Sequence, residues 1–149
     1  MRIIAGTARG RRLQAPAGLL TRPILDRQKQ MLFDVLGRRV EVQGVYDLFA
    51  GSGGLGLEAL SRGAGAATFV ERDRDALACL QANVTSCRFG ERSHVVAGDA
   101  LGFDFARGRH DAELVFVDPP FPFVAKQRAE LEQLLGALVA TPRVLPGAI

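Results

Sequence analysis

Apolar residues recur along the chain with two different periods, and the pattern changes near residue 44. Before that point, Arg2–Gly6 and Arg11–Ala15 have the composition of two short strands separated by a glycine-containing turn. After the break at Thr21-Arg22-Pro23, apolar side chains at helical spacing predict an amphipathic helix over residues 24–37. Its expected inward positions are Ile24, Met31, Leu32, Val35 and Leu36, and its expected polar face carries Arg27, Lys29 and Gln30.

From residue 45 onward, apolar strand-like runs alternate with amphipathic helical segments. The predicted strands are Val45–Ala50, Ala66–Glu71, His94–Gly98 and Leu114–Val117, and the predicted helices are Leu55–Arg62, Asp75–Val84 and Lys126–Ala140. This alternation is typical of an α/β fold with a parallel, Rossmann-like sheet that helices cover on both faces. It divides the chain into an N-terminal hairpin-and-helix extension, residues 1–43, and an α/β domain, residues 44–149.

The last predicted strand, Leu114–Val117, is apolar throughout and would lie at an edge of the sheet. Such an edge is normally paired or covered. The pattern therefore predicts either a C-terminally short version of a longer fold or a second chain at this edge, which makes self-association possible.

Composition limits the classes of protein that remain. The chain has 149 residues, of which 48% are hydrophobic, enough for one compact domain with a core. It contains no apolar run of the roughly 20 residues that cross a bilayer, and its first residues lack a secretory signal. Cys79 and Cys87 belong to no metal-binding cluster, so we expect a cytoplasmic protein that binds neither a membrane nor a metal.

Charge is distributed unevenly along the chain. Residues 1–43 hold nine basic and three acidic side chains, whereas the rest holds ten basic and 13 acidic ones. A basic extension on a mildly acidic body suits an enzyme that binds a polyanion, because phosphate contacts supply most sequence-independent affinity. A solvated, arginine-rich surface is the alternative.

The segment from Asp47 to Gly56 is a glycine-rich turn between a strand and a helix. Gly51, Gly53 and Gly56 let the backbone approach a ligand closely, at a helix start with unpaired N–H groups. The turn alone does not separate a dinucleotide from S-adenosylmethionine. Asp47 inside the strand favours the latter, since its carboxylate could face the cationic methionine end of that cofactor.

Acidic residues end the next two predicted strands. Glu71 follows Gly56 by 15 residues, where an acid can accept hydrogen bonds from both ribose hydroxyls. Asp73, close by, is expected to cap the following helix. Asp99 faces the ligand crevice and could accept a hydrogen bond from an adenine amino group, or it could simply cap a turn.

The tetrapeptide Asp118-Pro119-Pro120-Phe121 closes the last predicted strand. Its prolines lock the backbone and hold the Asp118 carboxylate and the Pro119 carbonyl on one side. Two acceptors on the N–H bonds of an exocyclic amine would favour the tetrahedral nitrogen that attacks a methyl group. Phe121 offers a face on which a flipped base can stack. A simple strand-terminating turn is the alternative.

Four stretches together resemble the bacterial 16S rRNA (guanine-N2)-methyltransferases of the RsmD type. They are Met1–Gly6 with Arg9–Leu13, Thr21-Arg22-Pro23 with Asp26-Arg27, Asp47–Gly56 continuing through Glu58–Ala64, and Asp118–Phe121. The basic second stretch separates this family from DNA amino methyltransferases that share only the acid-Pro-Pro-aromatic motif.

The resemblance implies a class I methyltransferase sheet that carries S-adenosylmethionine and methylates the N2 amine of a guanine in small-subunit rRNA, within an assembled ribosomal particle. The implied cofactor-binding residues are Asp47, Ala50, Gly51, Ser52, Gly53, Gly56, Glu71, Asp99 and Ala100. The implied catalytic residues are Asp118, Pro119, Pro120 and Phe121, and the implied RNA contacts are Arg9, Arg11, Arg12 and Arg22. Family members continue with further strands that this chain lacks.

Three other functions are compatible with parts of the pattern. The acid-Pro-Pro-aromatic motif also permits an amino methyltransferase acting on DNA adenine or on protein glutamine. The short C-terminus permits a protein that binds RNA or cofactor without turnover. A nicotinamide-dependent oxidoreductase would leave Asp118–Phe121 without a role.

Overall fold

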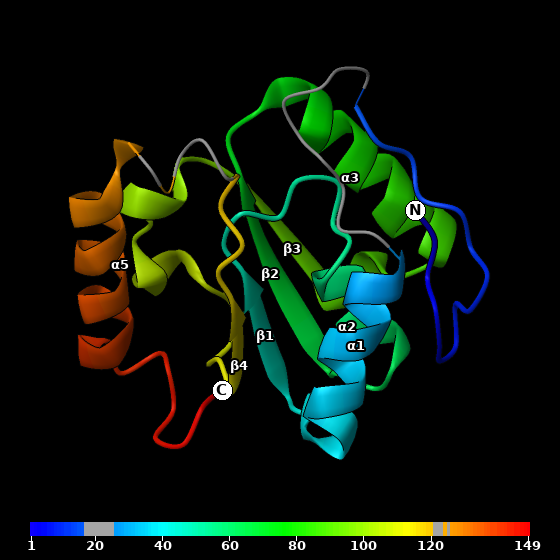
Figure 1. Ribbon diagram of the computed structural model, residues 1–149, viewed down its shortest axis with the longest axis horizontal. Coiled ribbons are helices and arrows are strands. Elements are labelled where there is room, and N and C mark those ends of the chain that lie inside the picture. The colour runs from blue at the N-terminus through cyan, green and yellow to red at the C-terminus, as the bar shows by residue number, and fades with distance from the viewer. Residues whose placement is uncertain (17–25, 121–123, 125) are drawn as a thin grey trace.

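The computed structural model describes residues 1–16, 26–120, 124 and 126–149 (Figure 1). Four strands alternate with helices in the order that the hydrophobic pattern predicts. The strands are β1 (Gly44–Asp47), β2 (Ala66–Glu71), β3 (Ser93–Ala97) and β4 (Leu114–Phe116). The helices are α1 (Asp26–Leu36), α2 (Gly56–Ser61), α3 (Arg74–Cys87) and α5 (Arg128–Ala140), with 3₁₀ turns η1 (Gly37–Val40), η2 (Gly90–Arg92), η3 (Ala100–Gly102) and η4 (Phe105–Arg107).

The strands form one parallel sheet in the order β3-β2-β1-β4 (Figure 1). The central strand β1 is buried along its whole length, which explains why its sequence alternates so little between apolar and polar residues. Because all strands run the same way, the segments that follow β1, β2, β3 and β4 meet at one edge of the sheet. The predicted α/β fold class is confirmed.

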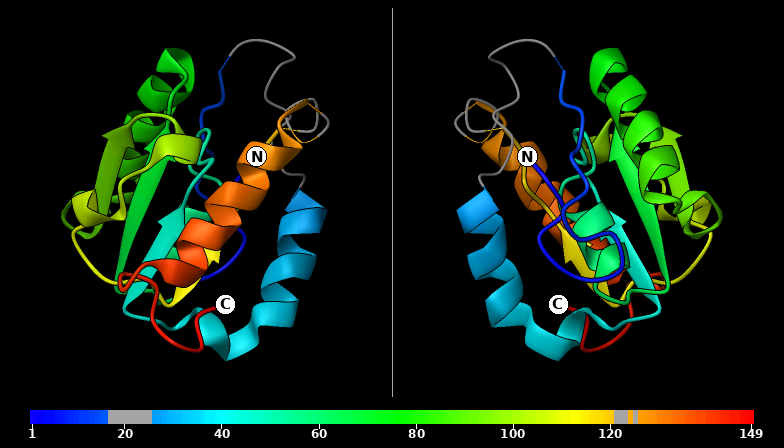
Figure 2. Two further views of the ribbon diagram at one scale, coloured as in Figure 1. Left: turned by 90° about the vertical axis from the view of Figure 1, so that its left-hand side faces the viewer. Right: turned by 90° about the vertical axis from the view of Figure 1, so that its right-hand side faces the viewer.

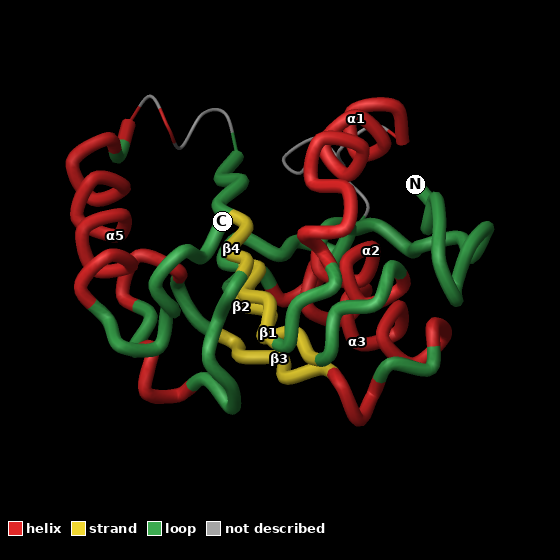
Figure 3. The backbone as a smooth tube through the Cα atoms, turned by 90° about the horizontal axis from the view of Figure 1, so that it is seen from below, coloured by secondary structure: helices red, strands yellow, loops and turns green. Residues whose placement is uncertain are grey.

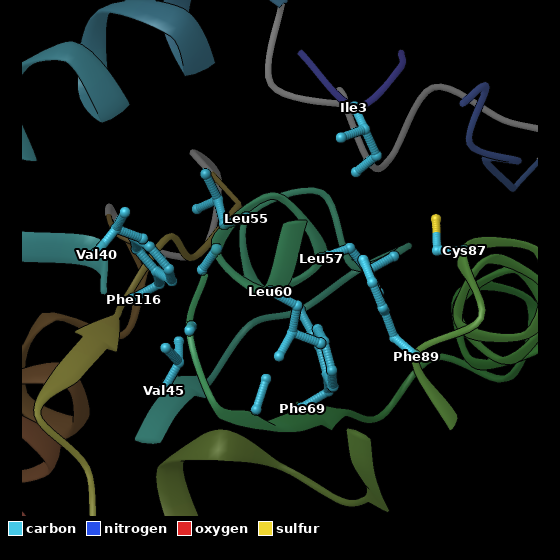
Figure 4. Packing of buried hydrophobic residues seen from close by; sticks show 14 of the residues in the cluster. Ile3, Val40, Val45, Leu55, Leu57, Leu60, Phe69, Cys87, Phe89 and Phe116 are labelled. Atoms are coloured by element: carbon cyan, nitrogen blue, oxygen red, sulfur yellow. The ribbon is translucent and has the colours of Figure 1, made fainter. Parts of the chain in front are cut away.

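Helices cover both faces of this sheet (Figures 1 and 2). One face carries α1, α2, α3 and the N-terminal segment, whose Ile3 and Leu13 join a core with Phe33, Leu57 and Phe69 (Figure 4). The other face carries α5 and the turns η3 and η4, packed around Tyr46, Phe103 and Leu134.

The inward face of α1 differs from the predicted one. Lys29, Phe33 and Leu36 are buried, whereas Met31 and Val35 are 60% and 83% exposed. The assignment of Lys29 to the polar face was therefore wrong. Its ammonium group lies 3.2 Å from the buried Glu58 carboxylate of α2 and donates a 2.6 Å hydrogen bond to Arg2 O, which compensates for its lost hydration. Ile24 lies outside the described residues.

The N-terminal segment is a hairpin held by few backbone bonds rather than a pair of strands. A single antiparallel bridge joins Arg2 and Arg12, with hydrogen bonds from Ile3 N to Arg11 O and from Leu13 N to Met1 O. The prediction that Arg2–Gly6 and Arg11–Ala15 form two strands was therefore wrong, because only one bridge pairs them. The residues between these two segments bond to α2 instead of pairing across the hairpin. Glu58 accepts hydrogen bonds from the N–H groups of residues 4 and 5, and Ser61 accepts them from residues 7 and 8.

The outer edge of β4 is paired by the chain itself. Ala112 N donates to Arg143 O at 2.7 Å, and Val115 N donates to Ile149 O at 2.8 Å. Leu145 N and Ile149 N return hydrogen bonds to Ala112 O and Glu113 O. The expectation of a bare edge was wrong over residues 112–115, and the prediction of self-association there loses its basis.

Candidate active site

The turn between β1 and α2 adopts a backbone that only glycine accommodates easily. Gly51 and Gly53 have φ angles of 54° and 87°, in the left-handed region that penalises a side chain. A Cβ on Gly53 would also lie 2.5 Å from Leu80 Cδ1, so this part of the turn rests directly on α3. A Cβ on Gly51 would meet nothing within 4 Å, so the turn is open on that side.

Glu71 holds the open part of this turn. Its Oε2 accepts a 2.7 Å hydrogen bond from Gly51 N, while Oε1 accepts from Arg72 N and Asp73 N, each at 2.8 Å. The acid predicted at the end of β2 therefore lies beside the glycine turn, 20 residues away along the chain. Asp73 caps α3 by accepting a 2.8 Å hydrogen bond from Ala76 N, as predicted.

Asp47 lies inside the sheet at the end of β1. Its carboxyl is buried and accepts a 2.9 Å hydrogen bond from Gly56 N, the first residue of α2. Burial raises the pKa of Asp47 from 3.8 to about 7, the hydrogen bond from Gly56 opposes that rise, and the charges of Asp118 and Glu71 add to it. The charges of Asp118 and Glu71 therefore act on Asp47 at this edge, where the negative field attracts a cationic ligand.

We expect Asp47→Asn to stabilise the free protein and weaken its binding of a cationic cofactor. An acid with a raised folded-state pKa destabilises the fold progressively from its unfolded value of 3.8 up to about 7, and fully above that. The variant keeps an oxygen for Gly56 N, so it should gain about 1–3 kcal/mol at pH 8 and little near pH 4. Thermal unfolding at both pH values measures this gain.

S-Adenosylmethionine should bind Asp47→Asn at least about tenfold more weakly, because we expect the Asp47 carboxylate to face the cationic end of the cofactor and the variant loses that charge. Asp104→Asn is the matched control, since Asp104 also caps a turn, by accepting from Ala106 N, but is exposed. Equal stability of Asp47→Asn and wild type at pH 8 would contradict the raised pKa.

Asp99 and Ala100 follow β3 at the same edge of the sheet. Asp99 Oδ1 accepts from Leu101 N at 3.1 Å, and Oδ2 pairs with Arg72 at 2.9 Å. Asp99 thus performs the turn-capping role named as its alternative, and its contact with an adenine amino group remains a prediction. Ala100 is buried beneath it.

The Asp-Pro-Pro segment leaves β4 next to the glycine turn. Leu48 N donates to Phe116 O at 3.0 Å, so the chains leaving β1 and β4 are joined where the sheet ends. Asp118 is exposed, yet the surrounding protein displaces part of the water around its carboxyl and raises its pKa. Pro119 is half-buried and Pro120 exposed. Phe121, the remaining predicted catalytic residue, lies outside the described residues.

The predicted RNA contacts lie apart from this edge. Arg9, Arg11 and Arg12 are exposed on the N-terminal hairpin, which runs beside α3 (Figures 1 and 3). Arg22 lies outside the described residues.

Asn83 and Glu58 hold the N-terminal hairpin in place, and the sequence pattern predicted a role for neither. Buried Asn83 accepts from Gln14 N at 2.8 Å and donates to Gln14 O and Ser52 O, each at 2.9 Å, which ties the hairpin to the glycine turn. One signal could have revealed Asn83, because it interrupts the inward stripe Ala76, Leu80 and Val84 of α3 with a polar side chain.

Two further classes of site receive no support from the described part of the chain. No three His, Cys, Asp or Glu side chains within it come together as a metal-binding group. None of its helices combines the length and apolar character needed to cross a bilayer.

Residues 1–145 match the family model described as "Conserved hypothetical protein 95". The chain belongs to this family. The protein named Ribosomal RNA small subunit methyltransferase D of Escherichia coli K12 is 40% identical over 138 residues, which cover 93% of this chain and 66% of that relative. The Haemophilus influenzae protein of the same name is 37% identical over 131 residues, covering 87% and 68%. The predicted relationship to the RsmD type is confirmed.

Solved structures agree with this membership. The structure of yhhF from Escherichia coli is 38% identical, with a TM-score of 0.80, over 97% of this chain and 75% of that one. A hypothetical protein of Thermus thermophilus, TTHA0928, is 36% identical, with a TM-score of 0.73, over 92% and 77%. The chain spans about two thirds of the length of the curated family members above.

Proposed function

We propose that this chain is an S-adenosylmethionine-dependent methyltransferase that modifies the N2 amine of a guanine in small-subunit rRNA. One observation carries the proposal: the Asp-Pro-Pro segment leaves the sheet beside the glycine turn, where Leu48 N bonds Phe116 O. The names of its family members, at about 40% identity, support rRNA as the substrate and methyl transfer as the reaction.

The residues at this edge fit S-adenosylmethionine. Asp47 and Glu71 supply negative charge for a sulfonium, and Gly51 leaves open space beside the turn. Ala50, Ser52, Gly53 and Gly56 form the rest of the proposed cradle, with Asp99 and Ala100 next to it. The cofactor supplies a methyl group on a cationic sulfur, and the protein supplies charge, shape and exclusion of water.

Asp118 and Pro119 orient the amine in this proposal. The lone pair of an exocyclic amine is delocalised into the base and attacks poorly. Hydrogen bonds from its two N–H groups to the Asp118 carboxylate and the Pro119 carbonyl favour a tetrahedral nitrogen whose lone pair points toward the methyl group. Asp118 accepts these bonds best when ionised, so its raised pKa makes transfer fall as the pH decreases.

Transfer of a labelled methyl group tests the function. The protein is incubated with methyl-labelled S-adenosylmethionine and either small ribosomal subunits, naked small-subunit rRNA, duplex DNA or a glutamine-containing peptide. We expect label in the ribosomal substrates, and N2-methylguanosine after nuclease digestion. Label in DNA adenine or in the peptide would refute the substrate, and cofactor binding without transfer to any of the four would refute the enzymatic function.

A further inference from the structure

The C-terminal end of α3 holds a residue in an unusual backbone conformation. Arg88 has φ 60° and ψ 38°, the single positive φ outside glycine among the described residues. Its N–H closes the helix on Thr85 O, and the N–H of Phe89 closes it on Val84 O, each at 3.0 Å. Glycine is the usual residue at such a helix end, because a Cβ disfavours the left-handed conformation.

The neighbouring residue imposes this conformation. Phe89 is buried in the core directly after the helix, and the Arg92 guanidinium lies 4.7 Å from its ring centroid. Arg92 also donates to Ala64 O and Leu60 O, which fixes the chain on the far side of the turn. The contacts before and after position 88 therefore fix its left-handed backbone conformation. Glycine, which has no Cβ, would adopt that conformation with less strain. The arginine side chain itself is exposed.

The N-terminal hairpin brings three further cations to the same end of α3. Ile3 and Leu13 of the hairpin share a core cluster with Cys87 and Phe89, the residues that flank Arg88 (Figure 4). Arg11 is close enough for its charge to lower the pKa of the Cys87 thiol, against the larger rise that burial causes. The hairpin lies beside the C-terminal end of α3 (Figures 1 and 3), so the exposed Arg9, Arg11 and Arg12 are carried by the segment next to exposed Arg88; we name these four residues the hairpin–α3 surface.

The cations of the hairpin–α3 surface differ from many arginines elsewhere in the chain. Arg2, Arg62 and Arg72 each pair with a carboxylate, at 3.2, 2.8 and 2.9 Å. Within the described residues, none of the four cations of the hairpin–α3 surface makes such a pair. Like charges that lie close together repel one another, and a polyanion is a partner that removes this repulsion.

We propose that Arg88 binds an RNA phosphate and extends the RNA-contacting surface from the N-terminal hairpin to the end of α3. The inference rests on the proposed rRNA substrate and adds a residue that none of its sequence motifs contains. Such a contact explains why an arginine occupies a position whose backbone favours glycine. The guanidinium would bind phosphate, which a glycine at this position could not do. Phosphate recognition is independent of base sequence, so this surface orients the RNA rather than selecting the guanine.

Arg88→Gly tests the proposal, because its two expected effects have opposite signs. Removing the Cβ relieves the backbone and should raise Tm by a few degrees. Losing one phosphate contact should weaken binding of naked small-subunit rRNA about three- to tenfold at 0.1 M salt, and should lower the salt slope by roughly one unit. Filter binding from 0.05 to 0.3 M salt and thermal unfolding measure the two effects.

Two control variants separate charge from conformation. Arg88→Lys keeps the charge and the Cβ, so it should retain rRNA affinity within about twofold and gain no stability. Arg109→Ala removes the same charge from the exposed loop before β4, and should leave the salt slope unchanged.

Unchanged rRNA affinity and salt slope in Arg88→Gly overturn the proposal, as does a loss of affinity accompanied by a lower Tm. If wild type methylates rRNA while Arg88→Gly binds it equally well, only this inference fails. If wild type neither binds nor methylates rRNA, the proposed function fails first.

Discussion

Replacing Asp118 by alanine is expected to reduce methyl transfer about 10²–10⁴-fold. The carboxylate is the charged acceptor of the amine in the proposed mechanism, and Asp118 is exposed just after the end of β4, where substrate can reach it. S-Adenosylmethionine affinity should stay within a few-fold, because the glycine turn, Asp47 and Glu71 are unchanged. Single-turnover transfer to small ribosomal subunits and calorimetric titration with the cofactor measure the two quantities.

Asp118→Asn is the matched variant. It keeps an acceptor oxygen and loses the charge, so its transfer rate should fall between those of wild type and alanine. At saturating cofactor, the part of the pH dependence that comes from Asp118 should disappear as well, because that carboxyl is gone. A hundredfold loss of cofactor affinity in Asp118→Ala would instead make Asp118 part of the cofactor pocket, and full activity would remove it from the mechanism.

Replacing Glu58 by alanine is expected to cost about 3–5 kcal/mol of stability. Its buried carboxylate accepts hydrogen bonds from Ile4 N at 2.8 Å and Ala5 N at 3.0 Å, pairs with Arg62 at 2.8 Å, and lies 3.2 Å from the Lys29 ammonium. Alanine leaves a fully buried cation without its partner and two N–H groups without acceptors. Urea unfolding at pH 7 measures the change.

Glu132→Ala provides the control for that measurement. Glu132 pairs with Arg128 at 2.9 Å on α5, but both side chains are exposed, so its loss should cost at most about 0.5 kcal/mol. Lys29→Met with Glu58→Gln should recover part of the stability lost by Glu58→Ala, since the fully buried Lys29 ammonium is removed together with its partner and only the partly exposed Arg62 loses a carboxylate. A loss below about 1 kcal/mol for Glu58→Ala would mean that water reaches the pair in solution.

The N-terminal hairpin depends on the same buried carboxylate. Glu58 and Ser61 bind residues 4, 5 and 8, and Asn83 binds Gln14 at the other end of the hairpin. These hydrogen bonds attach the basic N-terminal hairpin to α2 and α3. Its arginines are thereby held in place, so fewer conformations need to be restricted when a polyanion binds.

Predictions from short-range patterns agreed with the structure. The strand β2 has the predicted bounds Ala66–Glu71, and Asp73 caps α3. The glycine turn follows β1, and the Asp-Pro-Pro segment follows β4. In each case the signal is contained in a short stretch of sequence, so hydrophobic period, capping and turn chemistry suffice to find it.

Features that depend on distant partners were missed or misassigned. From the sequence alone, Lys29 is expected to be exposed to solvent. In the structure, its ammonium group lies 3.2 Å from the carboxylate of Glu58 in another helix. Likewise, the sequence alone does not show what pairs with the outer edge of β4. In the structure, residues 143–149 form backbone hydrogen bonds with Ala112 and Val115.

The sequence by itself determined the α/β class, the strand order along the chain, and the glycine turn and Asp-Pro-Pro motifs, because hydrophobic period and turn residues act locally. Only the tertiary structure decided which charges are buried, which backbone edges are paired, and which arginines gather at the end of α3. The physical reason is that burying a charge or leaving an edge unpaired costs several kcal/mol, and the group that offsets this cost lies far away in sequence.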